Sequence, residues 1–269
     1  MKNIPPVQDN YLQFTVIAAF VTTLGALLAM FIKEFLLVKY FDNVREKKAL
    51  QLVSKKYKDP ILLSAVELAR RLRELNAPHL PLSGTYTISF LFDQSTAMKK
   101  NDATDPYFLK YKIVSTIYRF CAFFGWLELF RQDITFLNSH SKKESQEFSR
   151  ILRIINSSIA DGQINNEPDW ETWKDVLIFR EELRAIGEGM IEIQGNQKTI
   201  FGYGKFKEIM SSAESVNNYP WLNPVTSFFT EFNKTKDFRI QRLDLLLKSL
   251  KELIKCLDKD YYEKHLTDL

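Results

Sequence analysis

The sequence predicts an all-α protein, in which a single N-terminal transmembrane helix is followed by a helical-bundle cytoplasmic domain. Residues 11–32 contain no charged side chain, and apolar residues recur at helical spacing along most of residues 59–257. The strand-like segment 85–92 has no second strand to pair with. The expected organisation is an extracytoplasmic tail, a transmembrane anchor, a juxtamembrane helix and a helical domain, at residues 1–10, 11–32, 33–58 and 59–269.

The uncharged segment 11–32 is long enough to cross a bilayer. At about 1.5 Å per residue, a helix over this segment spans about 33 Å, and the hydrocarbon layer is about 30 Å thick. Signal peptides have a shorter apolar core that ends at a cleavage site. This segment instead continues into Lys33, Glu34 and another apolar turn. We therefore predict an uncleaved anchor, with a buried core helix as the alternative.

Basic residues are concentrated after the anchor. Residues 33–58 carry a net charge of +5 and residues 59–269 a net charge of −1, which gives the chain its net +4. The positive-inside rule then places the N-terminus outside a bacterial inner membrane and the domain in the cytoplasm. The excess favours an anionic inner leaflet as partner and disfavours nucleic-acid binding. The expected headgroup contacts are Lys33, Lys39, Arg45, Lys47 and Lys48.

One face of the predicted anchor carries small side chains. They recur at alternating intervals of three and four residues, at Thr15, Ala18, Thr22, Gly25 and Ala29. Such a face lets two helices approach closely in a bilayer. We therefore predict a homo-oligomer formed through this face. The alternative is an ordinary anchor with its normal share of small residues.

The helical domain is expected to begin at Asp59-Pro60, because aspartate is a favoured N-cap and proline is favoured in the first turn. The preceding residues 33–56 form a basic amphipathic helix, either a stalk or a segment lying on the membrane surface. The first domain helix is expected to end at Asn76-Ala77-Pro78. Segment 85–92 is interpreted as a loop or a short helix.

The longest apolar helix is expected from Asp105-Pro106 to about Asn138. Because its centre is apolar almost all round, a second membrane span is the competing interpretation. Arg119 and Glu128 disfavour a span, since each charge would cost about 2.5–3.5 kcal/mol near a bilayer centre. We therefore predict a central helix of the domain core.

Further helices are expected at about 142–160, 170–193, 204–213, 223–233 and 238–257. The last has apolar residues at heptad spacing, which favours packing within the bundle over a coiled coil. The heptad residues are Ile240, Leu243, Leu247, Leu250, Ile254 and Leu257. Cys121 and Cys256 are interpreted as reduced core residues.

Four short motifs carry a resemblance to a known group of proteins. They are Tyr57-Lys58-Asp59-Pro60; Gly125-Trp126-Leu127-Glu128 with Arg131 and Phe136-Leu137; residues 179–188; and Leu253-Ile254 before Leu257-Asp258. In this order they resemble an uncharacterised family of bacterial membrane-anchored proteins with one N-terminal transmembrane helix. Leu183-Arg184 stands where that family is expected to have a glutamine-arginine pair. The resemblance implies one helical domain behind one anchor, and it implies no catalytic residue.

The best candidate site is the charged part of residues 179–188. It comprises Arg180, Glu181, Arg184 and Glu188, and the long apolar helix could add Trp126, Glu128 and Arg131. Two arginines can hold a phosphate or carboxylate bidentately. The alternatives are an exposed ladder of ion pairs and a buried ion-pair network. Gly187 and Gly189 in the same predicted helix suggest close packing or a break in the helix.

No motif indicates catalysis, a metal or a cofactor. The three histidines, His79, His140 and His265, have no partner at ligand spacing. Gly202-Tyr203-Gly204-Lys205 lacks the spacing of a phosphate loop and is interpreted as a turn. We therefore expect a membrane-tethered interaction module, a scaffold, sensor or adaptor, that is oligomeric or bound to a protein partner. The alternative is a membrane-anchored enzyme or ligand-gated effector that binds an anionic ligand through the Arg/Glu cluster.

Overall fold

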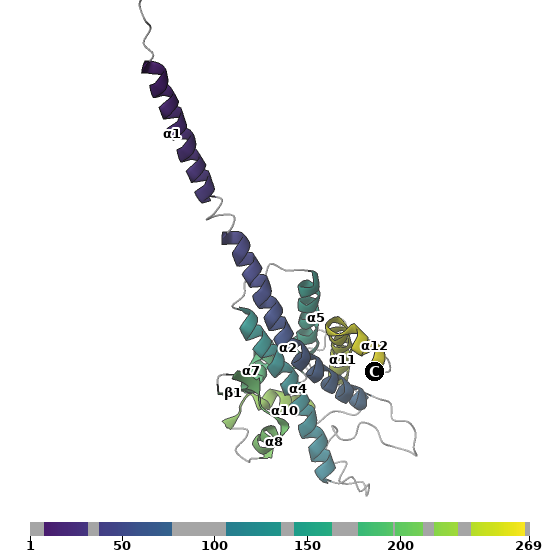
Figure 1. Cartoon of the computed structure of the whole chain (residues 1–269). Helices are drawn as coiled ribbons and strands as arrows, with labels where there is room; N and C mark the ends of the chain where they lie inside the picture. Colours follow the sequence, from purple (N-terminus) through teal and green to yellow (C-terminus); the bar gives the residue numbers. More distant parts are fainter. Residues whose placement is uncertain are drawn as a thin grey trace, which may run out of the picture. The chain divides into compact units, whose positions relative to one another are not determined.

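A computed structural model of the chain forms two compact units, Met1–Leu52 and Val53–Leu269 (Figure 1). Within the described residues the protein is mostly helical, with one short two-stranded hairpin. The prediction of a helical fold is therefore confirmed in its main part. The structure describes residues 8–31, 38–76, 106–135, 143–162, 177–195, 197–211, 218–230 and 238–266.

Helix α1, Gln8–Phe31, covers nearly all of the predicted anchor and begins inside the predicted tail. Every side chain from Phe14 to Ala26 is exposed, and the large apolar ones are 53% to 72% exposed. The hydroxyl of Thr22 donates to the carbonyl of Ala18 at 2.9 Å, and that of Thr23 donates to the carbonyl of Ala19 at 2.7 Å. Both hydroxyls are thus satisfied inside their own helix.

By length and composition, the described helical stretch that could cross a membrane is Lys110–Ile134, and 78% of an apolar 18-residue window within it is buried inside the protein. The described apolar stretch of α1, Phe14–Ala26, is shorter than a full span. Burial on this scale is typical of the core helix of a folded domain, whereas the side chains of Phe14–Ala26 are all exposed.

Helix α2, Val38–Asn76, is continuous and contains Pro60 in its interior. The prediction of a new helix at Asp59-Pro60 is therefore wrong. An interior proline costs about 3 kcal/mol because it lacks an N–H group and crowds the preceding turn. Burial of apolar side chains on both sides of Pro60 offsets this cost, since Tyr57 and Ile61 are almost completely buried. Of the expected headgroup contacts, Lys48 is exposed, Lys33 lies outside the described residues, and the side chains of Lys39, Arg45 and Lys47 are not described.

Helix α4, Pro106–Thr135, is the central helix of the second unit. Its apolar side chains are buried on several sides, and Phe120 and Phe123 are completely covered. The predicted core helix is confirmed at this position. Burial raises the pKa of the Cys121 thiol, as expected for a core cysteine, whereas Cys256 is exposed and the prediction that it lies in the core is wrong.

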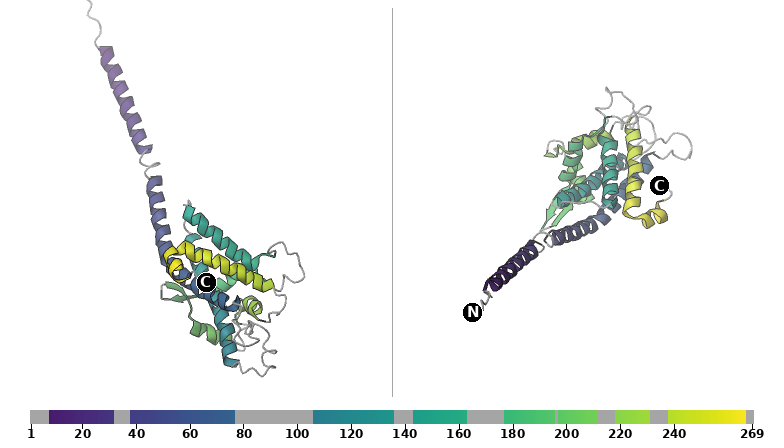
Figure 2. Two further views of the ribbon diagram at one scale, coloured as in Figure 1. Left: turned by 90° about the vertical axis from the view of Figure 1, so that its right-hand side faces the viewer. Right: turned by 90° about the horizontal axis from the view of Figure 1, so that it is seen from above.

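The remaining helices pack around α4 and against one another. Helices α5, Lys143–Ala160, and α11, Phe238–Leu257, lie side by side (Figure 2). Leu246 and Leu253 are buried together with the heptad residues from Leu243 to Ile254, so the apolar face of α11 is wider than a coiled-coil seam. Packing within the bundle is therefore confirmed. The other helices are α7, Arg180–Gly189; α8, Tyr203–Ser211; α10, Leu222–Phe229; and α12, Lys259–His265.

A β-hairpin replaces the last part of the helix predicted over 170–193. Helix α7 ends at Gly189, and strand β1, Ile191–Gln194, pairs antiparallel with β2, Gln197–Ile200. Gly195 has φ of 60°, a left-handed conformation that glycine adopts without strain in a tight hairpin turn. The hairpin corrects the purely helical prediction. Segment 85–92, His79 and His140 lie outside the described residues.

Candidate functional site

The charged residues of the predicted site are divided between two sets of partners. Nη2 of Arg180 lies 2.6 Å from Oδ1 of Asp161, just beyond the end of α5. Glu188, two turns further along α7, lies 3.9 Å from Nη2 of Arg131 on α4. Glu181 and Arg184 are exposed and form no ion pair with a described residue. The four predicted site residues of α7 therefore do not converge on one ligand position.

Glu128 is the buried member of the predicted site. Its side chain is 5% exposed and accepts hydrogen bonds from Nε and Nη2 of Arg131, at 2.7 and 2.5 Å. Nε2 of Gln132 donates a third bond, at 3.1 Å. The pKa of Arg131 is raised, chiefly by the hydrogen bond to Glu128. A two-pronged pair of this kind satisfies a carboxylate that is otherwise shielded from water.

The Glu128 pair lies where α7 crosses α4. A Cβ atom at Gly187 would lie 2.8 Å from Cβ of Glu128 and 2.8 Å from the carbonyl oxygen of Phe124. A Cβ atom at Gly189 would lie 2.4 Å from the ring of Trp221. Close packing therefore explains both glycines. Trp126 is half-buried, and its ring centroid lies 6.5 Å from that of Tyr57.

Two buried arginines of α11 bind the ends of neighbouring helices. Nη1 of Arg239 donates to the carbonyls of Ser227, Phe228 and Thr230 at the end of α10, at 3.1, 3.2 and 2.8 Å. Nη1 of Arg242 donates to the carbonyl of Ser158 near the end of α5, at 3.2 Å. Carbonyls at a helix C-terminus lack partners within the helix and carry partial negative charge. These arginines therefore hold the fold together, and they are not among the residues predicted from the sequence.

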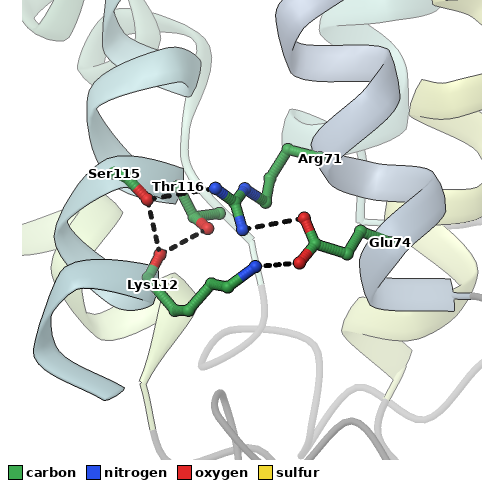
Figure 3. Close-up of polar contacts among 5 residues, drawn as sticks. All are labelled: Arg71, Glu74, Lys112, Ser115 and Thr116. Carbon is green, nitrogen blue, oxygen red and sulfur yellow. Dashed lines mark hydrogen bonds and ion pairs between the residues drawn. The ribbon is translucent and has the colours of Figure 1, made fainter. Parts of the chain in front are cut away.

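A third polar cluster joins α2 to α4 (Figure 3). This cluster was also not predicted from the sequence. The side chain of Arg71 is only 3% exposed. Its Nη1 atom lies 2.9 Å from Oε2 of Glu74, and its Nη2 atom donates to Oγ of Ser115 at 3.2 Å. The ammonium group of Lys112 also contacts the Glu74 carboxylate. The hydroxyls of Ser115 and Thr116 both donate to the backbone carbonyl of Lys112, which fixes this turn of α4.

Among the described residues, this cluster joins one carboxylate, that of Glu74, to more than one positive side chain. The pKa of Arg71 is lowered first by burial and then by the nearby charge of Arg119, while Glu74 and Tyr111 act in the opposite direction. Nε of Arg71 has no hydrogen-bond partner among the described residues. Arg119 is half-buried and forms no hydrogen bond or ion pair with a described residue. We call Arg71, Lys112 and Arg119 the cationic cluster.

One sequence signal could have identified Arg71 as a buried residue. Ser64, Leu68, Arg71 and Leu75 follow one another at intervals of four, three and four residues, and all four are buried. Arg71 therefore belongs to the apolar face of its helix, whereas the neighbouring Arg70 is exposed. The partner residues on α4 lie too far along the chain for spacing to reveal them.

Within the described part of the chain, no group of three or more histidine, cysteine or acidic side chains is placed to hold a metal ion. Comparisons with models of protein families, with curated proteins and with solved structures found no match.

Proposed function

We propose that this protein is a membrane-tethered interaction module, with α1 as its anchor and the second unit as a cytoplasmic domain that binds a partner. The observation that carries the proposal is that every apolar side chain from Phe14 to Ala26 is exposed. Leaving apolar surface in water costs about 25 cal/mol per Å². A bilayer covers such a helix on all sides at once, whereas a protein groove covers one side.

Length and internal hydrogen bonding also support the anchor. The 24 residues of α1 give a helix of roughly 36 Å, which exceeds the hydrocarbon layer. Because the hydroxyls of Thr22 and Thr23 bond to their own backbone, they bring no unsatisfied donor into lipid. The basic residues 33–58 give the orientation, N-terminus outside and domain inside a bacterial membrane. The resemblance to a family of membrane-anchored proteins, which implies one helical domain behind one anchor, is part of the same proposal.

The polar contacts of the domain support an interaction role more than an enzymatic one. Glu128, Arg239 and Arg242 are engaged in contacts that hold helices together. Arg180 and Glu188 contact different partners, which favours the interaction role over a single anion site on α7. A scaffold, sensor or adaptor needs a stable surface and a position at the membrane, and a helical bundle behind an anchor provides both.

Thiol labelling tests the orientation. In spheroplasts of bacteria that produce the full chain, a membrane-impermeant maleimide is expected to label Asn3→Cys, made in a Cys256→Ser background, before the membrane is opened. Native Cys256 is exposed on the domain and is expected to react at least tenfold faster after permeabilisation. Cys121 is buried and serves as the unreactive internal control. Equal labelling of Cys256 before and after permeabilisation would contradict the proposed topology.

Substitution of Gly25 tests self-association through the small-residue face. No heavy atom lies within 4 Å of the position that a Cβ atom would occupy at Gly25, so Gly25→Leu leaves the helix itself unstrained. It adds bulk to the face that must approach a second copy. We expect crosslinked dimer in membranes to fall about tenfold, a change of about 1.4 kcal/mol. Leu24→Ala, on the opposite face, is expected to leave the dimer unchanged. An unaltered dimer in Gly25→Leu would exclude this face.

A further inference from the structure

The cationic cluster brings three positive side chains together from facing surfaces of α2 and α4. Lys112, Ser115 and Arg119 are spaced by three and four residues and so lie on one face of α4. Arg71 reaches that face from α2, where it donates to Oγ of Ser115 at 3.2 Å. Figure 3 shows Arg71 and Lys112 meeting at Glu74. Arg119 lies one helical turn beyond Ser115 on the same side.

Two arginines of this cluster have donors without an acceptor among the described residues. Glu74 serves both Arg71 and Lys112, and its own side chain is 42% exposed. Nε of Arg71 and the whole guanidinium group of Arg119 have no acceptor among the described residues. Glu67, a further described carboxylate of α2, is exposed and forms no ion pair with a described residue. The positive groups are thus the more buried ones, and the negative groups lie towards water.

Tyrosine side chains add further donors beside Arg119. The ring of Tyr203 on α8 packs edge-on against Tyr111 and Tyr118, with centroids 6.3 and 5.4 Å apart. The pKa of Tyr203 is raised by burial first and then by the nearby tyrosines, while Arg119 and Arg71 act in the opposite direction. The Tyr203 hydroxyl donates no hydrogen bond to a described residue. Among the described residues its hydroxyl has no acceptor, and it lies close enough to Arg119 and Arg71 for their charges to oppose the rise in its pKa.

We propose that the cationic cluster, with the hydroxyls of Tyr111 and Tyr203, binds a phosphate-type oxyanion: inorganic phosphate, or the phosphate monoester end of a small molecule or lipid. A guanidinium fork matches two oxygens of such a group, a lysine adds a point charge, and phenol hydroxyls donate to a third oxygen. A doubly charged group also relieves the repulsion between Arg71 and Arg119, which a singly charged carboxylate does less completely. This site goes beyond the proposed tethering function and does not depend on it.

Thermal unfolding of the full chain in phosphatidylcholine nanodiscs tests the site. Inorganic phosphate is titrated against chloride at constant ionic strength, and Tm is followed by tryptophan fluorescence. At a hundred times its Kd, phosphate is expected to raise Tm by about 5–10 °C. Arg119→Gln is expected to abolish this rise. Without phosphate, its Tm is expected to equal or exceed that of the wild type, because Arg119 has no ion pair or hydrogen bond with a described residue to lose and its positive charge disfavours that of Arg71.

Arg70→Gln is the matched control. It removes an exposed arginine next to Arg71 on α2 and is expected to keep the full rise. Arg119→Lys keeps the charge but loses the fork, so we expect a smaller rise in that variant. If Arg119→Gln does not fold, the rise in Tm of Arg119→Lys is compared with that of the wild type instead. A rise of wild-type size in either Arg119 variant would overturn the proposal.

A second arm separates a soluble ligand from a lipid. Nanodiscs that contain phosphatidic acid are compared with phosphatidylcholine discs in buffer free of phosphate. A rise in Tm that depends on Arg119 and occurs only with phosphatidic acid assigns the site to a lipid headgroup. A rise with soluble phosphate alone assigns it to a soluble phosphate. No rise in either arm overturns the site. Failure of the proposed anchor can be distinguished from failure of the proposed phosphate site, because without an anchor the chain would not enter the nanodiscs.

Discussion

Replacing Gly187 with alanine is expected to destabilise the second unit by roughly 2–3 kcal/mol. The new methyl group would lie 2.8 Å from the carbonyl oxygen of Phe124, and backbone cannot rotate away as a flexible side chain can. It would also press on Cβ of Glu128, so α7 must move off α4 and weaken the ion pair between the buried Glu128 and Arg131. Urea unfolding of the full chain in detergent, followed by circular dichroism, measures the loss.

Gly204→Ala is the control, because this substitution is expected to stabilise the protein whereas Gly187→Ala is expected to destabilise it. Gly204 lies in the first turn of α8, and no heavy atom lies within 4 Å of its Cβ position. Alanine restricts the unfolded chain and favours the helix, so we expect a stabilisation of about 0.5–1 kcal/mol. If both alanine variants changed stability in the same direction, the close crossing of α4 and α7 would be contradicted.

Phe120→Ala is expected to cost roughly 3–5 kcal/mol, the largest effect of a single substitution considered for this chain. Phe120 is completely buried, with its ring centroid 4.7 Å from that of Phe124 and 5.3 Å from that of Phe229. Its removal leaves a cavity between α4 and α10, and both the transfer energy and the ring contacts are lost. We expect Tm to fall by roughly 10 °C, measured by differential scanning fluorimetry.

Leu63→Ala is the matched truncation at the surface. Leu63 lies on α2 and is 60% exposed, so its removal is expected to change stability by about 0.5 kcal/mol or less. A cost near that of Phe120→Ala would mean that a partner covers Leu63. A cost below about 1 kcal/mol for Phe120→Ala would contradict its place in the core.

Helices with a strong apolar periodicity could be predicted from the sequence. The expected bounds 238–257 coincide with α11, and the apolar centre of α4 was placed in the core. Pro60 shows the limit of local rules. Proline favours the first turn of a helix, but Tyr57 and Ile61 are buried on either side of it and keep α2 continuous. Burial in the tertiary structure therefore contributes more to the continuity of α2 than the local preference of proline does. The spacing of residues in the sequence does not reveal this burial.

The hairpin after α7 escaped prediction because its strands are only four residues long. Ile191 and Ile193 also continue the apolar spacing of the preceding helix, so the two interpretations compete. The Gly195-Asn196 pair was the signal for a turn. Its left-handed glycine decides in favour of the hairpin.

The candidate site could be predicted only in part, for a geometric reason. Spacing placed Arg180, Arg184 and Glu188 on one helix, and Glu128 with Arg131 on another. The partner of each charge depends on where other elements pass, and Asp161 reaches Arg180 from beyond the end of α5. Arg71 lies one residue from an exposed arginine, so composition alone does not distinguish the buried cation.

The arginines bound to helix ends also determine how this protein responds to ionic strength. Added salt screens charges that water can reach and has little effect on those enclosed by protein. Salt therefore weakens exposed pairs such as Arg150 with Glu147 and leaves Arg239 and Arg242 on their carbonyls. We propose that segment 33–58 binds an anionic surface, and salt concentrations that weaken such binding are compatible with an intact bundle. Salt titration can therefore separate the cations proposed to bind lipid from those that hold the fold.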